Sequence, residues 1–258
     1  MSRAGFIALA AGVLGALAVA IVAAWFFLLR DVAEPTSIGE AVTSFRTDTE
    51  PAPAAPSPIP EGVYVYATHG YEKTDALTGV THRYPKRSTI TITAAACGVS
   101  LLWRVLDGRS TEWIYCVNPD GWELRSQDER HTFFGRTERT TYTCEKTPIR
   151  PAEPSVGMRW RISCSTDGAE ETGTGRVVGR ERFSLTGGPV VTLLHIRKAT
   201  TFTGEIRGTA RHDIWFHWES GVPDKIVMVS RTTNDSPVGD VHYDEEVALF
   251  LTSLTPRR

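Results

Sequence analysis

The stretch STITITAAAC, residues 88–97, decides the fold of most of this chain. Ile90 and Ile92 alternate with threonines, and a period of two between apolar and polar residues is typical of a β-strand with one buried face. Eight further segments are similarly rich in β-branched and aromatic residues. They are GVYVYATHGYE (62–72), VSLLWRVL (99–106), STEWIYCV (110–117), MRWRISC (158–164), VVTLLHI (190–196), HDIWFHW (212–218), DKIVMVS (224–230) and YDEEVALFL (243–251).

Residues that favour turns stand between these segments. The turn signals are Asp107-Gly108, Asn118–Gly121, Asp167-Gly168, Gly187–Pro189, Ser220–Pro223 and Asn234–Pro237. No helical pattern of ordinary length follows residue 60, and strands joined by short turns pair antiparallel with their sequence neighbours. The fold is therefore predicted to be all-β, with about 9 to 12 antiparallel strands in a meander.

Some of the predicted strands carry large apolar side chains on both faces. In HDIWFHW, Ile214 and Phe216 point to one face and Trp215 to the other. A single open sheet with one wet face would alternate more cleanly, and an open sheet also exposes edges that invite aggregation. We therefore expect a curved sheet that closes as a barrel or half-barrel, or that is covered on its second face.

A second stretch, AGFIALAAGVLGALAVAIVAAWFFLL at residues 4–29, carries no charge. A helix needs about 20 apolar residues to cross a bilayer, whereas the core of a cleaved leader has roughly 7 to 15. Arg3 precedes the run and Arg30 is offset by acidic residues, so the amino terminus is expected in the cytoplasm. We predict a single-pass signal anchor over residues 1–30 in the cell membrane, with a cleaved leader as the alternative.

Residues 31–60 are predicted to form a stalk. Ser37 and Glu40 have the spacing of a capping box and begin an apolar stripe, which predicts a short helix. PAPAAPSPIP, residues 51–60, disfavours both helix and sheet and favours a polyproline II rod, with a disordered linker as the alternative. The rod would hold the β domain, residues 61–258, away from the membrane on its outer side.

The charge of the chain is balanced. Lys and Arg number 28, Asp and Glu number 30, and the formal net charge is −2. A nucleic-acid-binding protein needs a basic face for the phosphates, and no run of Lys or Arg provides one. We therefore expect no nucleic-acid partner.

Four cysteines, Cys97, Cys116, Cys144 and Cys164, follow the predicted anchor. An even number of cysteines outside the cytoplasm favours disulfides. Three pairings are possible, and we prefer Cys97 with Cys116 and Cys144 with Cys164, because each pair brackets about one hairpin. A zinc site is the alternative, but the spacings contain no Cys-x-x-Cys knuckle.

No catalytic or cofactor motif is recognisable. The glycines between Gly173 and Gly179 lack the spacing and the helix of a phosphate loop, and Glu245 and Glu246 point to opposite faces of their strand. Three histidines could meet across neighbouring strands with Asp213 or Asp244 nearby; they are His195, His217 and His242. A lone strand histidine is more often a packing residue, so we assign no catalytic, cofactor or metal site.

The block CGVSLLWRVL…WIYC and the closing segment, residues 202–258, carry a resemblance to a family. They resemble uncharacterised actinobacterial-type envelope proteins that have an amino-terminal anchor. No activity is assigned to that family, so the resemblance implies none for this chain. The succession of strands is more distantly similar to lipoprotein-carrier half-barrels, which hold lipid in a concave sheet. This chain departs from those carriers because it lacks their lipobox and the helices that line their cavity.

The sequence thus favours a non-catalytic, membrane-anchored extracytoplasmic domain. Six tryptophans and two-faced apolar strands suggest that it binds an apolar ligand or an envelope component. One alternative is a structural or accessory subunit, docked to a membrane partner through a track of small residues on the anchor helix. Another is an envelope hydrolase that uses His195, His217 or His242.

Overall fold

A computed structural model describes residues 33–48, 59–77, 79–184, 190–236 and 239–258. The anchor predicted over residues 1–30 and most of the rod predicted over residues 51–60 lie outside the described residues. Within the described ranges, no helix combines the length and the apolar character needed to cross a membrane.

The predicted all-β class is confirmed. The described residues form one short helix and thirteen strands, slightly more than predicted. The elements are α2 (Ile38–Asp48), β1 (Gly62–Thr74), β2 (Val80–Arg83), β3 (Arg87–Ala95), β4 (Gly98–Leu106), β5 (Arg109–Asn118), β6 (Gly121–Phe133), β7 (Arg136–Pro151), β8 (Arg159–Ser165), β9 (Ala169–Ser184), β10 (Val190–Gly204), β11 (Ile206–His217), β12 (Pro223–Asn234) and β13 (Val241–Leu251).

The sheet closes into a barrel of twelve antiparallel strands, with β2 added outside the ring. Each strand from β3 to β13 pairs with the next one along the chain, as predicted for a meander. β1 pairs with β3 through residues 62–67 and with β13 through residues 66–74. β2 pairs with β1 only at residues 71–74, where β3 has ended. The closed barrel is therefore the correct choice among the predicted forms.

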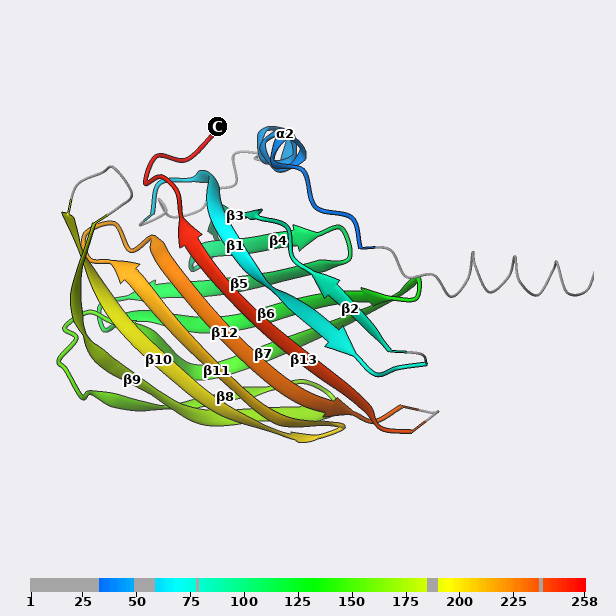
Figure 1. The fold of residues 1–258 in the computed structure, drawn as a ribbon. Coiled ribbons are helices and arrows are strands. Elements are labelled where there is room, and N and C mark those ends of the chain that lie inside the picture. Colours follow the sequence, from blue (N-terminus) through cyan, green and yellow to red (C-terminus); the bar gives the residue numbers. More distant parts are fainter. Residues whose placement is uncertain (1–32, 49–58, 78, 185–189, 237–238) are drawn as a thin grey trace, which may run out of the picture.

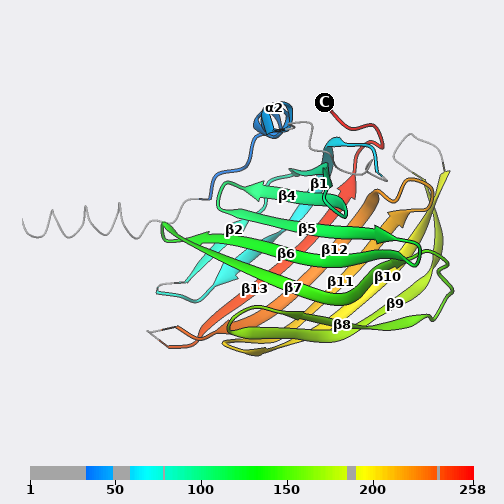
Figure 2. The same ribbon diagram turned by 180° about the vertical axis from the view of Figure 1, so that it is seen from behind.

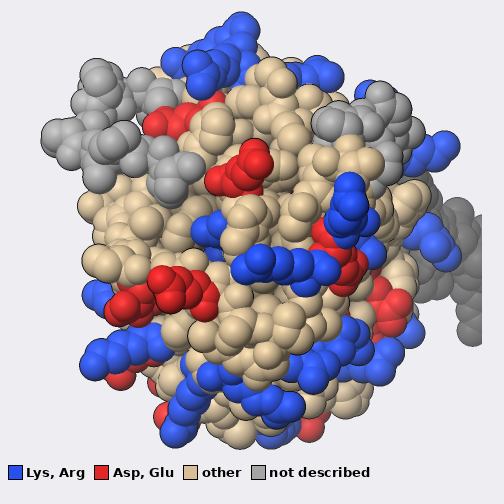
Figure 3. Space-filling model, turned by 90° about the vertical axis from the view of Figure 1, so that its left-hand side faces the viewer, with Lys and Arg blue, Asp and Glu red and all other residues tan. Residues whose placement is uncertain are grey.

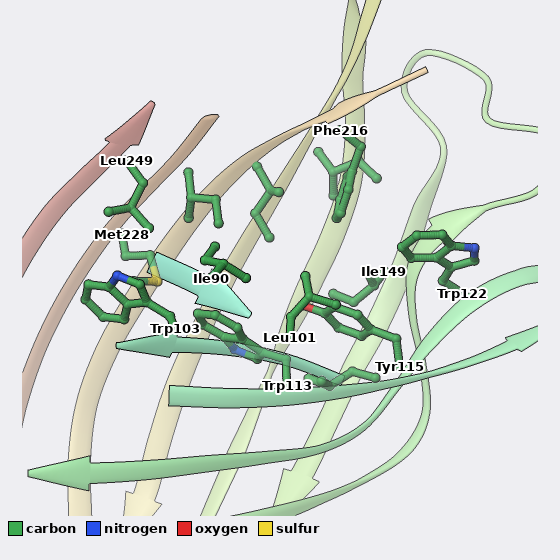
Figure 4. Packing of buried hydrophobic residues seen from close by; sticks show 14 of the residues in the cluster. Ile90, Leu101, Trp103, Trp113, Tyr115, Trp122, Ile149, Phe216, Met228 and Leu249 are labelled. Atoms are coloured by element: carbon green, nitrogen blue, oxygen red, sulfur yellow. The ribbon is translucent and has the colours of Figure 1, made fainter. Parts of the chain in front are cut away.

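The barrel is flattened. Figures 1 and 2 show β10–β13 on one side crossing β4–β7 on the other at a steep angle. Apolar side chains from both sides fill the space between them, as Figure 4 shows for Trp103 and Trp113 on one side and Met228, Phe216 and Leu249 on the other. Side chains therefore fill the interior of the barrel between β4–β5 and β11–β13.

The segment HDIWFHW, residues 212–218, carries apolar side chains on both faces because both faces are covered, as predicted. Ile214 and Phe216 belong to the main core inside the barrel. Trp215 lies on the outer face, in a second apolar cluster with Val191 and Leu193. The strand is therefore apolar on both faces because the outer wall carries a small core of its own.

The predicted capping box is confirmed. The Ser37 amide donates to the Glu40 carboxylate at 3.3 Å, and the Glu40 amide lies 3.5 Å from the Ser37 hydroxyl. Ala41 is buried on this helix, which contacts β1 and β3. Just before the helix, Pro35 pairs with Leu106 of β4. This part of the predicted stalk therefore lies against the barrel.

Both preferred disulfides are present, so none of the four sulfurs is available to a zinc ion. Cys97–Cys116 joins the ends of β4 and β5, which pair along their whole length. Cys144–Cys164 joins β7 and β8, whose ladder consists of only two residue pairs. Next to it, the Ser163 amide donates to the Thr147 hydroxyl at 3.3 Å. The second disulfide therefore reinforces the shortest ladder between neighbouring strands of the ring.

Removing the two disulfides should have unequal effects. The bridges span 19 and 20 residues, so chain entropy alone predicts a similar loss of about 3 kcal/mol for each. We expect a larger loss for C144A/C164A than for C97A/C116A, because little other pairing holds β7 to β8. Urea unfolding of the full chain in mild detergent measures the difference. Equal losses would contradict this role for Cys144–Cys164.

Candidate functional site

The three histidines considered from the sequence do not form one site. His195 and His217 share the outer face of the barrel, but the Nδ1 of His217 lies 3.0 Å from the Ser220 hydroxyl, away from His195. His242 begins β13 and contacts the Thr233 hydroxyl at 2.9 Å. Only His195 finds a predicted partner, with Nε2 2.7 Å from Asp213.

His195 is clamped on the outer wall. Its ring stacks on Trp215 with 4.0 Å between centroids. Its two nitrogens face two carboxylates, Asp213 at 2.7 Å and Glu181 at 3.0 Å. A catalytic triad histidine keeps one nitrogen for the nucleophile, and here both are occupied. The arrangement therefore fixes the strands and does not suit a general base.

A second polar group of residues, not predicted as a site, lies inside the barrel, where it borders the aromatic core at Trp103. We call it the interior ionic cluster. It consists of Glu72, His82, Tyr84, Arg109, His131, Tyr243 and Glu245, which come from β1, β2, β5, β6, β13 and the turn after β2. Glu245 points inward and Glu246 outward, as the alternation predicted.

Arg109 and Glu245 form the centre of the interior ionic cluster. Two guanidinium nitrogens of Arg109 donate to the two oxygens of Glu245 at 3.0 and 2.8 Å. The third nitrogen donates to the Thr111 hydroxyl at 2.7 Å, and the Tyr84 hydroxyl donates to Glu245. The guanidinium also lies over the Trp103 ring at 5.1 Å. A buried ion pair needs such additional hydrogen bonds to offset the cost of desolvation.

Glu72 is the second anion of the interior ionic cluster. His82 and His131 contact its two oxygens at 3.0 and 3.2 Å, and the Tyr243 hydroxyl donates at 3.2 Å. Burial alone would raise the pKa of Glu72, but the hydrogen bonds from the histidines and the charge of Arg109 lower it from 4.5 to about 2. Glu72 is therefore ionised at neutral pH.

His131 lies between two carboxylates. Burial and the charge of Arg109 act to lower its pKa, but hydrogen bonds to Glu129 and Glu72 outweigh them and raise the pKa above its ordinary 6.5. Tyr243 contacts the His131 ring edge-on at 4.9 Å. The imidazolium form of His131 is therefore the form that the folded barrel stabilises.

The interior ionic cluster has the geometry of a structural network. Its carboxylates are occupied by donors, and the Nδ1 atoms of both histidines face Glu72. Within the described residues, no three histidine, cysteine, aspartate or glutamate side chains form a group that could hold a metal ion. The period-two alternation of β1 could have indicated part of this cluster. Residues at even positions from Tyr64 and Tyr66 onward face the interior, and Glu72 belongs to the same series.

Two hollows lie on the surface near the interior ionic cluster. One of about 280 Å³ is bordered by Glu72, His82 and Arg130. A larger one, of about 510 Å³, lies between residues 36–44 and the outer wall of β4–β7, where Arg104 and Arg139 line it. Inside the barrel, the space between Lys198, His212 and the apolar core is only about 10 Å³, which is the size of a single water site.

Comparison with known proteins identifies no relative. No family model matches the chain, and no curated protein or solved structure is similar to it.

Replacing His131 by Gln should remove part of the pH dependence of stability. The pKa of His131 is higher in the folded than in the unfolded chain, so its contribution is full below pH 6.5 and is lost as the pH rises through the folded pKa. Urea unfolding above pH 6.5 should show the wild type losing stability more steeply than H131Q. H69Q, which alters an exposed histidine on β1, serves as control. Parallel curves for wild type and H131Q would contradict this role.

Proposed function

We propose that residues 61–258 are a non-catalytic binding domain, held on the outer side of a membrane by an anchor over residues 1–30. We further propose that its outer wall, and not its interior, contacts a component of the cell envelope.

Two features support the outer compartment. The uncharged run at residues 4–29 is long enough to span a bilayer, and Arg3 precedes it. All four cysteines are paired in disulfides between neighbouring strands. Structural disulfides persist in oxidising compartments and are rare in the cytosol.

The filled interior is the observation that supports binding on the outer wall. An apolar ligand inside the barrel would compete with the aromatic side chains of the core, where only about 10 Å³ remains beside Lys198 and His212. Beside Trp103 it would have to displace the ion pair of Arg109 and Glu245, and separating a buried pair costs about 3–5 kcal/mol. The outer wall, by contrast, has hollows of several hundred Å³.

Cysteine accessibility in intact cells tests the proposed compartment. Thr203 is exposed on β10, and the native cysteines are bonded to one another, so T203C adds one reactive thiol. A membrane-impermeant maleimide should label T203C without lysis and S2C only after lysis. The reverse pattern, with S2C labelled in intact cells and T203C protected, would contradict the proposal.

A further inference from the structure

Five arginines gather on the outer wall of β8–β11, and we call this surface the arginine wall. Its members are Arg159, Arg161, Arg176, Arg197 and Arg211. Core residues next to them in sequence, such as Ile162, Val177 and Ile196, point into the barrel, so these arginines point outward. Figure 3 shows Lys and Arg side chains forming a band across the lower part of this side of the molecule.

The register places three of these arginines in one row. Arg159 lies opposite Arg176, and Arg176 lies opposite Arg197. Side chains directly opposite each other in a sheet have Cβ atoms about 5 Å apart, and like charges at that distance are destabilising. Folding therefore brings together positive charges from three consecutive strands, at an electrostatic cost.

The protein itself neutralises only part of this charge. Asp213 accepts hydrogen bonds from Arg197 and Arg211, both at 2.7 Å, and also contacts His195. In the part of the chain that the structure describes, no carboxylate lies within 4.0 Å of Arg159, Arg161 or Arg176. Of the five guanidinium groups, those of Arg197 and Arg211 thus have a carboxylate within 4.0 Å, that of Asp213, while Glu181 on the same wall contacts His195.

A hollow of about 350 Å³ borders the arginine wall beside Arg211. Small and hydroxyl side chains line it, including Ala199, Thr201 and Thr209. Thr201 and Thr209 are exposed and lie opposite each other on β10 and β11. Hydroxyl groups can both donate and accept hydrogen bonds, so this hollow matches a ligand that carries hydroxyl groups of its own.

We propose that the arginine wall binds an acidic glycan, that is, a linear sugar polymer carrying carboxylate or phosphate groups. The row of Arg159, Arg176 and Arg197 would pair with successive acidic groups, because the guanidinium fork binds both oxyanions in bidentate fashion. The hollow beside Arg211 would receive a sugar ring. This inference rests on the proposed function and names the envelope component that the outer wall contacts.

Two other polyanions fit the wall less well. A single-stranded nucleic acid needs a series of exposed aromatic rings on which successive bases stack. Phe183 of β9 is exposed, but His195 and Lys225 lie over the nearby ring of Trp215. An anionic bilayer is a flat surface, whereas the wall is the side of a curved barrel with a hollow in it. The row of arginines beside a hydroxyl-lined hollow favours a chain of sugars.

Binding of a defined acidic glycan tests the assignment. The full chain in nanodiscs of uncharged lipid is presented with polygalacturonate, or with neutral dextran as the control polymer. We expect salt-sensitive binding of polygalacturonate, weakened about tenfold or more in R159Q/R176Q. R87Q/R136Q removes the same charge from exposed positions on β3 and β7 and should bind like the wild type.

Each of the following outcomes would overturn the assignment of an acidic glycan to the arginine wall. Equal weakening in the two double variants would mean attraction by net charge alone, and equal binding of dextran would mean that the acidic groups are not recognised. Tighter binding to separate vesicles that contain phosphatidylglycerol than to polygalacturonate would assign the wall to a bilayer. Absence of polygalacturonate binding in a chain that passes the T203C labelling test would reject the glycan and leave the proposed compartment intact.

The stability of R159Q/R176Q separates loss of a binding site from loss of the fold. These arginines repel each other across β8 and β9, so their removal should leave the melting temperature unchanged or raise it. Weaker binding together with a lowered melting temperature would mean that the arginines serve the fold, and would contradict the proposed binding role.

Discussion

β1 pairs with β3 along one edge near its start and with β13 along the other edge over the rest of its length, and the pairing with β13 closes the sheet. The pairing joins the first and last strands of the chain, so each of the twelve strands of the ring has a neighbour on both sides, while β2 stays outside the ring. Closure removes the free edges that an open antiparallel sheet exposes. It also separates an inside, where charged groups must be paired, from an outside, where they need not be.

The contents of the barrel follow from that separation. Aromatic side chains such as Trp103 fill the space between the crossing walls. Beside Trp103, Arg109 joins Glu245 of the opposite wall, and Glu72 holds two histidines. Both regions are occupied by the protein's own side chains, which is why we propose that recognition takes place on the outer wall. The stalk helix and the arginine wall belong to this outer surface.

The sequence predicted local structure better than it predicted the sites. Period-two patterns and turn residues indicated the all-β meander, and Ser37 with Glu40 indicated the helix. The strands β6, β7 and β9 carry many polar residues, which weakened their periodicity, so they were not identified individually. The interior ionic cluster could not be predicted because Glu72, Arg109 and Glu245 meet only after closure. The arginine wall was missed for a similar reason: its residues come from four strands and form no run.

Cross-linking β1 to β13 tests closure most directly. Lys73 and Asp244 lie opposite each other in the register, and opposed strand residues have Cα atoms about 4.5–5.5 Å apart, within reach of a disulfide. In K73C/D244C, mass spectrometry of unreduced peptides should find residues 73 and 244 linked. K73C/A248C, displaced by four residues or about 13 Å along β13, should remain unlinked. An unlinked K73C/D244C, or equal linking in both variants, would contradict the closed barrel.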